Sequence, residues 1–391
     1  MTISAIGRGE VAGDSRSHEA IVAGSIAGLA ALAALLHAVT PFNHDEAYFI
    51  ALAGRLLDGG RFGSDIMDIN PPHVWWIAAI PVWLARQVGG RLEIAAAVFT
   101  AMLAAVSLVA VDRLLAANGS AGLMRRAFVP IAAILLLLVP GYDFGQREHW
   151  MLLLTLPYVV ARGERMDGAT ISPVAGAVIG VAACLGFCIK PYYLLVPIAL
   201  EIWLLARTRR PRLSICPETI AMAITGVAYA GLILVYARSY LETEMPNALL
   251  GYWSYKSPMP EVLLSATVQL APTAVLALFG VLTRNRGERL PPLAQAFAVA
   301  GATNLVAALI QMKPWSYHFL PSMVFFDLSV LVILMSGPSR AGTQSLRRAA
   351  VAILIVTGVS PSAAEAFRSF QDGGSASRVD ELAAVFRANP G

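Results

Sequence analysis

The chain has 391 residues, of which 57% are hydrophobic and only 14% are charged, and its formal net charge is +4. A water-soluble protein of this length needs far more charged surface, so the composition excludes a soluble domain and predicts a multi-pass membrane protein. The net charge then reflects how arginine is distributed around membrane helices, and we expect no nucleic-acid partner.

Apolar segments of about 17–22 residues recur along the chain, the length that crosses a bilayer as an α-helix. The first, residues 21–39, is not followed by a small-residue cleavage site, so we expect a retained anchor helix. Residues 40–91 form a large first loop. Within it the sequence predicts one amphipathic helix over 45–58 and a second helix over 72–87.

The shorter loops after this point alternate between two kinds. The arginine-rich loops contain Arg113, Arg125 and Arg126; Arg162 and Arg165; Arg207, Arg209, Arg210 and Arg212; Arg284, Arg286 and Arg289; and Arg340, Arg347 and Arg348. The loops between them are "GYDFGQREH", "IKPYY", "SYLETEMPNALLGYWSYKSPMP" and "QMKPWSYH", which hold few basic residues. By the positive-inside rule, the first kind should be cytoplasmic and the second kind should face outward.

This alternation decides the place of the helix over 72–87. If it crossed the membrane, every later loop would be inverted, so we expect it to lie at the outer membrane surface. Its tryptophans, Trp75, Trp76 and Trp83, are then expected at headgroup depth. The fold class is therefore an all-α membrane protein with about eleven transmembrane helices, its N-terminus inside and its C-terminus outside.

Residues 1–361 form the predicted membrane domain. Residues 362–391 form a short outer tail, loop-like from Pro361 onward except for the amphipathic pattern "RVDELAAVFRA". The three cysteines, Cys184, Cys188 and Cys216, are expected to be packing residues, because two of them lie four apart in an apolar helix and no disulfide framework is implied.

Acidic, basic and histidine side chains gather on the predicted outer face. They are His44, Asp45 and Glu46; Asp65, Asp68, Asn70 and His73; Asp143, Gln146, Arg147, Glu148 and His149; Lys190 and Tyr192; Lys256; and Lys313, Tyr317 and His318. The three lysines are the only ones in the chain and all fall on outer loops, whereas the predicted cytoplasmic charge is arginine. Lysine offers a compact ammonium that suits a phosphate.

Each of these groups also has a structural interpretation. Acids favour the first turn of a helix, so the acidic pair at 45–46 can serve as a cap. Residues 147–148 can form an ion pair at a helix end, and the lysines can extend to the membrane interface. The four histidines of the outer loops show no metal-ligand spacing, and "REHW" is not the two-histidine zinc motif. A divalent metal stays an open possibility, and no cofactor is firmly implied.

Residues 44–76 resemble the first outer loop of the GT-C glycosyltransferases, which include lipid A aminoarabinose transferases and protein mannosyltransferases. The shared features are an acidic pair after the first spanning helix, an amphipathic helix and a Pro-Pro-aromatic stretch, here "HDEAYFIALAGRLLDGG" and "INPPHVWW". "CIKPYYLLVP" is similar to the family's Lys-Pro helix start, and "YHFLP" matches more weakly. Ala47 and Tyr48 follow the acidic pair where many relatives carry arginine, and either Asp143 or Glu148 stands for the acid of the second outer loop.

The resemblance implies a GT-C fold and a sugar donor carried on a polyprenyl phosphate, with inversion at the anomeric carbon. The acceptor would be a lipid or a glycan, at the periplasmic face of a bacterial-type inner membrane. Asp45 is the candidate base, with Glu46 or Glu148 holding the acceptor or tuning the base. Arg147, Lys190 and Lys313 are candidates for the phosphate. Further substrate contacts are expected from His44, Asp143, His149, Tyr192, Lys256, Tyr317 and His318.

Other functions predict different patterns. A polysaccharide polymerase or ligase would also use a lipid-linked glycan, but such enzymes generally rely on basic residues in a large late outer loop. A secondary transporter would carry its ionisable groups in the middle of helices, whereas the helix interiors here are almost free of charge. A purely structural scaffold leaves the outer cluster unexplained.

Overall fold

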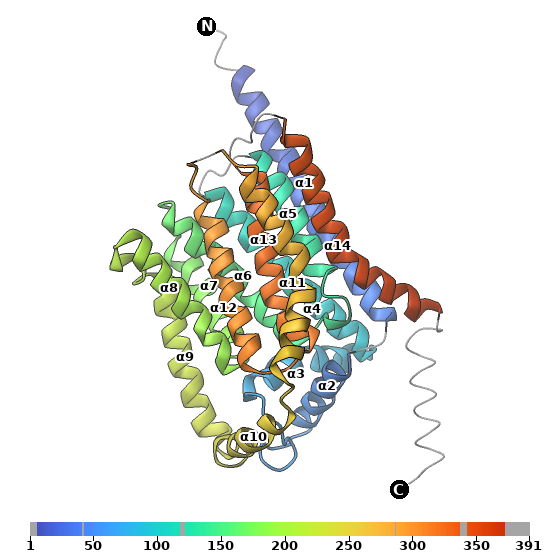
Figure 1. Cartoon of the computed structure of the whole chain (residues 1–391). Helices are drawn as coiled ribbons and strands as arrows, with labels where there is room; N and C mark the ends of the chain where they lie inside the picture. The colour runs from blue at the N-terminus through green and yellow to red at the C-terminus, as the bar shows by residue number, and fades with distance from the viewer. Residues whose placement is uncertain (1–5, 41–42, 118–121, 286, 337–341, 372–391) are drawn as a thin grey trace.

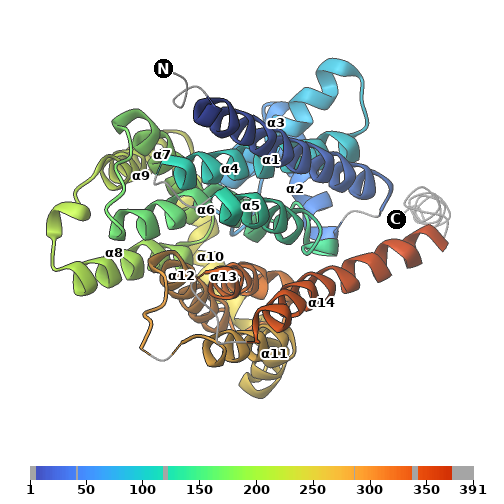
Figure 2. The same ribbon diagram turned by 90° about the horizontal axis from the view of Figure 1, so that it is seen from above.

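The computed structural model describes residues 6–40, 43–117, 122–285, 287–336 and 342–371. Over these residues the chain is a bundle of helices and contains no β-strand (Figures 1 and 2). The helices pack side by side along most of the length of the molecule, so most side chains that are buried are buried between helices.

Fourteen α-helices occur in the described chain, joined by short turns. They are α1 (Ile6–Val39), α2 (His44–Leu57), α3 (Pro72–Val88), α4 (Leu92–Ala117), α5 (Gly122–Leu137), α6 (Arg147–Met166), α7 (Pro173–Phe187), α8 (Leu195–Thr208), α9 (Pro217–Tyr236), α10 (Met245–Gly251), α11 (Met259–Leu282), α12 (Pro292–Ile310), α13 (Ser316–Met335) and α14 (Gln344–Gln371). The turns are η1 (Gly141–Asp143), η2 (Pro191–Leu194), η3 (Pro211–Leu213), η4 (Tyr240–Glu244) and η5 (Tyr252–Tyr255).

Six helices are long and apolar enough to cross a membrane: α1 over Glu19–Ala38, α4, α9, α11, α12 and α13. Helices α5, α6, α7, α8 and α14 run beside them in the bundle (Figure 1) but do not meet the same length and composition. These spans support a multi-pass membrane protein. The predicted count of eleven spans stays a prediction.

The first loop contains the two predicted helices, and each of their ends lies within one residue of its predicted position. Helix α2 begins after Asn43, whose side chain accepts a hydrogen bond from the backbone N–H of Asp45 at 3.0 Å, so Asn43 and not the acidic pair provides the side-chain cap. Helix α3 begins with Pro72, where the missing N–H costs nothing, and ends at Gly89 with a left-handed φ of 65°.

Helices α2 and α3 pack against each other through aromatic side chains. Trp75 is fully buried, and its ring centroid lies 5.3 Å from that of Phe49. Trp75 thus faces α2, and its expected position at headgroup depth stays a prediction. Trp83, two turns further along, is 51% exposed, and its expected position at headgroup depth also stays a prediction.

Helix α6 lies at the centre of the bundle and contacts α4, α7, α8, α12 and α13. Nearly all of its side chains are buried, including charged ones near both ends. The charged residues at its N-terminus belong to the predicted outer cluster. Those at its C-terminus belong to a separate ion network.

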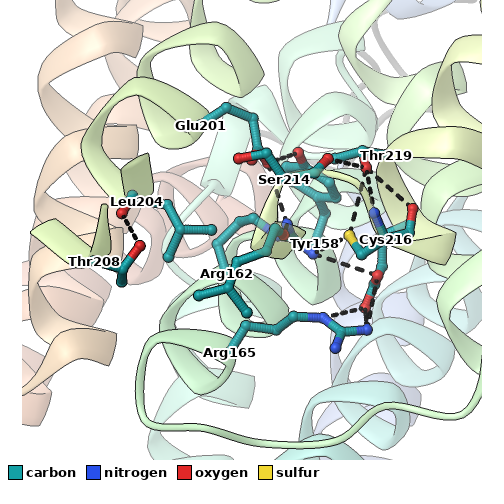
Figure 3. Close-up of polar contacts among 11 residues, drawn as sticks. Tyr158, Arg162, Arg165, Glu201, Leu204, Thr208, Ser214, Cys216 and Thr219 are labelled. Atoms are coloured by element: carbon teal, nitrogen blue, oxygen red, sulfur yellow. Dashed lines mark hydrogen bonds and ion pairs between the residues drawn. The ribbon is translucent and has the colours of Figure 1, made fainter. Parts of the chain in front are cut away.

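That second network ties α6 to α8 and α9 (Figure 3). Arg162 is completely buried and contacts Glu201 at 3.2 Å and Glu218 at 3.4 Å, and Arg165 also contacts Glu218, at 3.0 Å. The sequence assigns both arginines to a cytoplasmic loop, whereas α6 continues through them to Met166. These ion pairs hold α6, α8 and α9 together at this end of the bundle.

Three further features concern the end of α14, the cysteines and one acidic residue inside a helix. Helix α14 continues through Pro361 to Gln371, so this part of the expected loop-like tail is helical, in agreement with the helix-forming "SAAEAF" segment. Residues 372–391, with the amphipathic pattern, lie outside the described residues. All three cysteines are free thiols. Asp327, within α13, accepts a hydrogen bond from Thr273 of α11 at 2.6 Å, an exception to the expected charge-free helix interiors.

Candidate active site

A cavity of about 850 Å³ opens among the segments that the sequence assigns to the outer face. Its walls come from the start of α2, the segment before α3, η1, the start of α6, η2, the η4–α10–η5 segment and the connection between α12 and α13. Helices α2, α3 and α10 lie together at one end of the bundle (Figure 1), so the cavity is at that end. Segments nearly 300 residues apart in the chain thus share one site.

The acidic pair of the first loop divides between two environments. Asp45 lines the cavity and its side chain is 24% exposed, whereas Glu46 is buried and does not line it. Successive residues on an α-helix point about 100° apart, and here this rotation directs Asp45 toward the cavity and Glu46 away from it. The carboxyl of Glu46 packs against Gly145, where a β-carbon would collide with it. Burial raises the pKa of Glu46 to about 8.

Arg147 stands at the first position of α6 and lines the cavity beside Asp45. Its Nη2 lies 3.4 Å from Asp45 Oδ2, its Nη1 donates a hydrogen bond to Asn70 Oδ1, and the guanidinium carbon lies 4.3 Å from the centroid of the Phe49 ring. The side chain is only 8% exposed. The first loop and α6 are therefore joined at the cavity wall by one guanidinium.

Lys190 precedes Pro191 as the sequence predicts, but its ammonium is already occupied. Its Nζ lies 2.5 Å from Glu148 Oε1 and donates a hydrogen bond to Gln311 Oε1 at 2.9 Å. His318 Nε2 is 3.3 Å away. Burial lowers the pKa of Lys190 to about 8 and Glu148 opposes this shift, so the lysine is mostly protonated at neutral pH. The segment that follows is a short 3₁₀ turn, η2, before α8 begins.

Lys313 has different surroundings, an aromatic cage formed by Tyr252, Tyr255 and Trp315. Its Nζ lies 4.0, 5.6 and 4.5 Å from the three ring centroids, respectively. The residue is 2% exposed and lines the cavity, and no carboxylate lies within 4.0 Å of it among the described residues. A cation held only by ring faces keeps its charge available to an anion.

The other predicted site residues separate into two groups. His44, Asp143, Tyr192, Tyr317 and His318 line the cavity. His149 does not, because Leu136 O and Gly145 N occupy its two ring nitrogens, at 2.9 and 3.2 Å. Lys256 is exposed and lies outside the cavity, and Glu148 lies behind Lys190. These positions favour a structural part for His149 and Glu148.

Several residues that line the cavity, or contact residues that line it, were not selected from the sequence. Gln311, at the end of α12, accepts hydrogen bonds from Lys190 and from the Tyr252 hydroxyl, the latter at 3.4 Å. Tyr240 lines the cavity and donates to Ile69 O at 3.1 Å. A polar side chain two residues before Lys313 was the available signal for Gln311. The tyrosines stand in a segment whose composition is that of an ordinary interfacial belt, so nothing marked them.

Among the described residues, no three histidine, cysteine or carboxylate side chains gather in a way that could hold a metal ion. The cavity is lined by three carboxylates, Asp45, Asp68 and Asp143, by three cations, Arg147, Lys190 and Lys313, and by aromatic rings.

The arrangement of helices matches the crystal structure of ArnT from Cupriavidus metallidurans bound to undecaprenyl phosphate. The TM-score is 0.55 at 15% sequence identity, and the match covers 87% of this chain and 62% of that chain. The chain has a GT-C fold. The GT-C resemblance of the first loop is thereby confirmed at the level of fold. This chain spans less than two thirds of the length of ArnT, and no protein-family model and no curated protein sequence matches it.

Proposed function

We propose that this protein is a membrane glycosyltransferase that moves a sugar from a polyprenyl-phosphate donor to a lipid or glycan acceptor. The observation that carries the proposal is the cavity in which Asp45 lies beside Arg147 and within one enclosed space with Lys313. A carboxylate and buried cations in one cavity suit transfer from a phosphate leaving group. The fold shared with a protein that binds undecaprenyl phosphate supports a donor of this kind.

The donor phosphate is best matched by Lys313 and Arg147. Among the described residues no carboxylate lies within 4.0 Å of Lys313, and Arg147 lies at 3.4 Å from Asp45, a long contact for a charge-assisted hydrogen bond. Lys190 is the weakest of the three candidates, since Glu148 at 2.5 Å already balances its charge. We therefore assign Lys190 to shaping the cavity wall.

The chemistry follows from these positions. An acceptor hydroxyl attacks the anomeric carbon from the face opposite the phosphate, forming the new glycosidic bond and inverting the centre. The hydroxyl proton goes to the Asp45 carboxylate. The bond between the anomeric carbon and the phosphate oxygen breaks, and its electron pair leaves with the polyprenyl phosphate. Arg147 and Lys313 stabilise the additional negative charge on that leaving group.

The prenyl chain needs an apolar route from the cavity to the bilayer. Met245 and Leu249, on the η4–α10 segment, line the cavity and are 42% and 61% exposed. We assign the exit of the chain to this side. The acidic residues then lie at the depth where a lipid-linked donor presents its headgroup, and the alternation of arginine-rich loops supports the periplasmic face for this end of the bundle.

The proposal is tested by reconstitution. The full chain, purified into nanodiscs, is supplied with polyprenyl-phosphate sugars and a lipid extract of the source membrane, and products are followed by mass spectrometry. We expect free polyprenyl phosphate and a glycosylated acceptor to appear together, and to fail together in Asp45→Asn. Lipid-linked sugars and envelope glycans that do not change when the gene is removed from cells would contradict the proposal.

A further inference from the structure

The guanidinium of Arg147 is held by Asn70 of the first loop, and Asn70 is held in turn by Asp68; no part of the proposed reaction yet uses either residue. Asn70 is 6% exposed, and its side-chain oxygen accepts the hydrogen bond from Arg147 Nη1. Asp68 is half-buried and lines the same cavity. Both precede α3 in the stretch "DINPPH".

Asp68 fixes which way the Asn70 amide points. Asp68 Oδ1 accepts hydrogen bonds from the Asn70 backbone N–H at 2.7 Å and from its side-chain Nδ2 at 2.5 Å. Only the nitrogen of an amide can donate to a carboxylate, and only the oxygen can accept from a guanidinium. The two charged neighbours of Asn70 therefore determine its orientation without ambiguity.

The backbone of this stretch is also constrained. Asn70 precedes Pro71 and Pro72, and a residue before proline is restricted to extended conformations. The Tyr240 hydroxyl donates to Ile69 O at 3.1 Å, which ties the stretch to the η4 segment. Asn70 is thus a rigid point of attachment for Arg147.

We propose that Asp68 and Asn70 are positioning residues that act through Arg147, an inference that rests on the proposed function for its catalytic meaning. Asn70 takes one terminal nitrogen of the guanidinium at its edge, and the Phe49 ring supports its face. The other terminal nitrogen is then directed at Asp45 and into the cavity. A guanidinium whose plane and rotation are already fixed binds a phosphate without losing further conformational freedom. A mobile guanidinium would lose that freedom on binding.

The neutral amide matters as much as its geometry. A carboxylate at position 70 would form a full ion pair with Arg147 and compete with the substrate phosphate for it. An asparagine oxygen orients the guanidinium without adding a second carboxylate to that of Asp45, which lies 3.4 Å from Arg147. Asp68 supplies the negative charge one step removed, where it holds the amide and does not touch Arg147 in any contact of the described residues.

The test compares Asp68→Ala, Asn70→Ala and the conservative Asp68→Asn in the full chain in nanodiscs. The readouts are the Kd of undecaprenyl phosphate, donor KM and kcat, and thermal stability. Asp58→Ala is the matched control, because Asp58 forms a similar pair with Arg86 in the same loop, at 2.8 Å, but both side chains are exposed and lie outside the cavity.

We expect each alanine variant to weaken binding of undecaprenyl phosphate by about tenfold, the scale of one hydrogen bond to a charged group. Asp68→Asn keeps an acceptor for the amide and should stay within about threefold of wild type. In an Arg147→Gln background, Asn70→Ala should add nothing further. A residue that only supports the fold would lower stability and the active fraction while leaving Kd and KM unchanged.

Wild-type affinity in folded Asn70→Ala, or an equal further loss in the Arg147→Gln background, would overturn the inference while leaving the proposed function intact. The opposite failure is distinguishable. If the wild type binds undecaprenyl phosphate with the expected dependence on Asp68 and Asn70 but transfers no sugar, the proposed function is wrong and the positioning of Arg147 stands.

Discussion

Lys190 Nζ lies 2.5 Å from Glu148 Oε1, and this contact joins the η2 turn to the first turn of α6. Glu148 is fully buried and Lys190 is 7% exposed, so both charges have left water. The pair converts two residues that the sequence marks as candidates for substrate into a fixed part of the cavity wall. Removing either charge should then lower the stability of the protein more than it weakens donor binding.

We predict that Lys190→Ala lowers the free energy of unfolding by about 3–5 kcal/mol, because it leaves the Glu148 carboxylate buried without its partner. The double variant Lys190→Met/Glu148→Gln removes both charges at similar volume and should recover most of that loss. Chemical denaturation in detergent measures both. Lys190→Ala with full stability and weakened donor binding would return Lys190 to the phosphate.

Lys313 should behave in the opposite way. We predict that Lys313→Ala weakens donor binding by about 1.5–3 kcal/mol, the scale of one charge-assisted hydrogen bond, with a small effect on stability. Lys256→Ala is the matched control, since Lys256 is an exposed outer-loop lysine that lies outside the cavity. Equal affinities in the two variants, measured with purified protein in nanodiscs, would exclude Lys313 as the phosphate ligand.

Asp45 and Glu46 allow a comparison of neighbours. Asp45→Asn removes the proton acceptor while keeping the shape of the side chain, so turnover should fall by about a hundredfold or more in a folded protein. Glu46→Gln should be much milder, because the Glu46 carboxyl packs against Gly145 and does not line the cavity. Near-normal transfer by Asp45→Asn would shift the role of base to Asp143, the acid of the second outer loop that lines the cavity.

The sequence predicts the parts of the site that depend on position along the chain. Helices α2 and α3 were expected within a residue of their observed ends, because the Pro-Pro pair and the glycines mark those ends. Asp45, Arg147 and Lys313 were expected at one end of the bundle and meet in one cavity there. A charged residue at the end of an apolar segment strongly indicates the end of the bundle at which it lies, since a membrane-spanning bundle has few other positions for a charge.

What the sequence does not predict is which way each side chain points and which partner it has. Asp45 and Glu46 look equivalent in the sequence. Neighbouring side chains on a helix point in different directions, however, and only Asp45 lines the cavity. Lys190 and Lys313 are both lysines next to a proline, yet one meets a carboxylate from α6 and the other meets three aromatic rings. Arg162 was expected in a loop, and it is instead buried beside carboxylates of α8 and α9, whereas Trp75 is buried against the neighbouring helix α2.

Glu46 also gives a prediction about pH. Burial raises its pKa from 4.5 to about 8, so the folded state holds this proton over a range in which the unfolded state has released it. A carboxyl with a raised pKa contributes stability that is complete below pH 4.5 and is lost as the pH rises through about 8. The melting temperature of wild type should therefore fall across this range more steeply than that of Glu46→Gln, which does not titrate. Parallel curves for the two proteins would contradict the buried, neutral state of Glu46.

The last prediction concerns the side of the membrane on which the cavity opens. Ser64 precedes α3 and Ser254 lies in η5, both exposed and both at the cavity end of the bundle. Thr170 is exposed in the turn between α6 and α7, next to the Arg162 network at the other end of α6. The alternation of arginine-rich loops assigns the first two positions to the outer face and Thr170 to the cytoplasm.

Single cysteines at these positions, in a chain whose three native thiols are replaced by alanine, report the side directly. We expect Ser64→Cys and Ser254→Cys to react in intact cells with a thiol reagent that does not cross membranes. Thr170→Cys should react only after the membrane is opened, which also shows that this thiol is accessible. Labelling of Thr170→Cys in intact cells, together with protection of Ser64→Cys, would invert the topology. A lipid-linked donor would then have to be presented from the cytoplasmic leaflet, and the acceptor would have to be sought on that side.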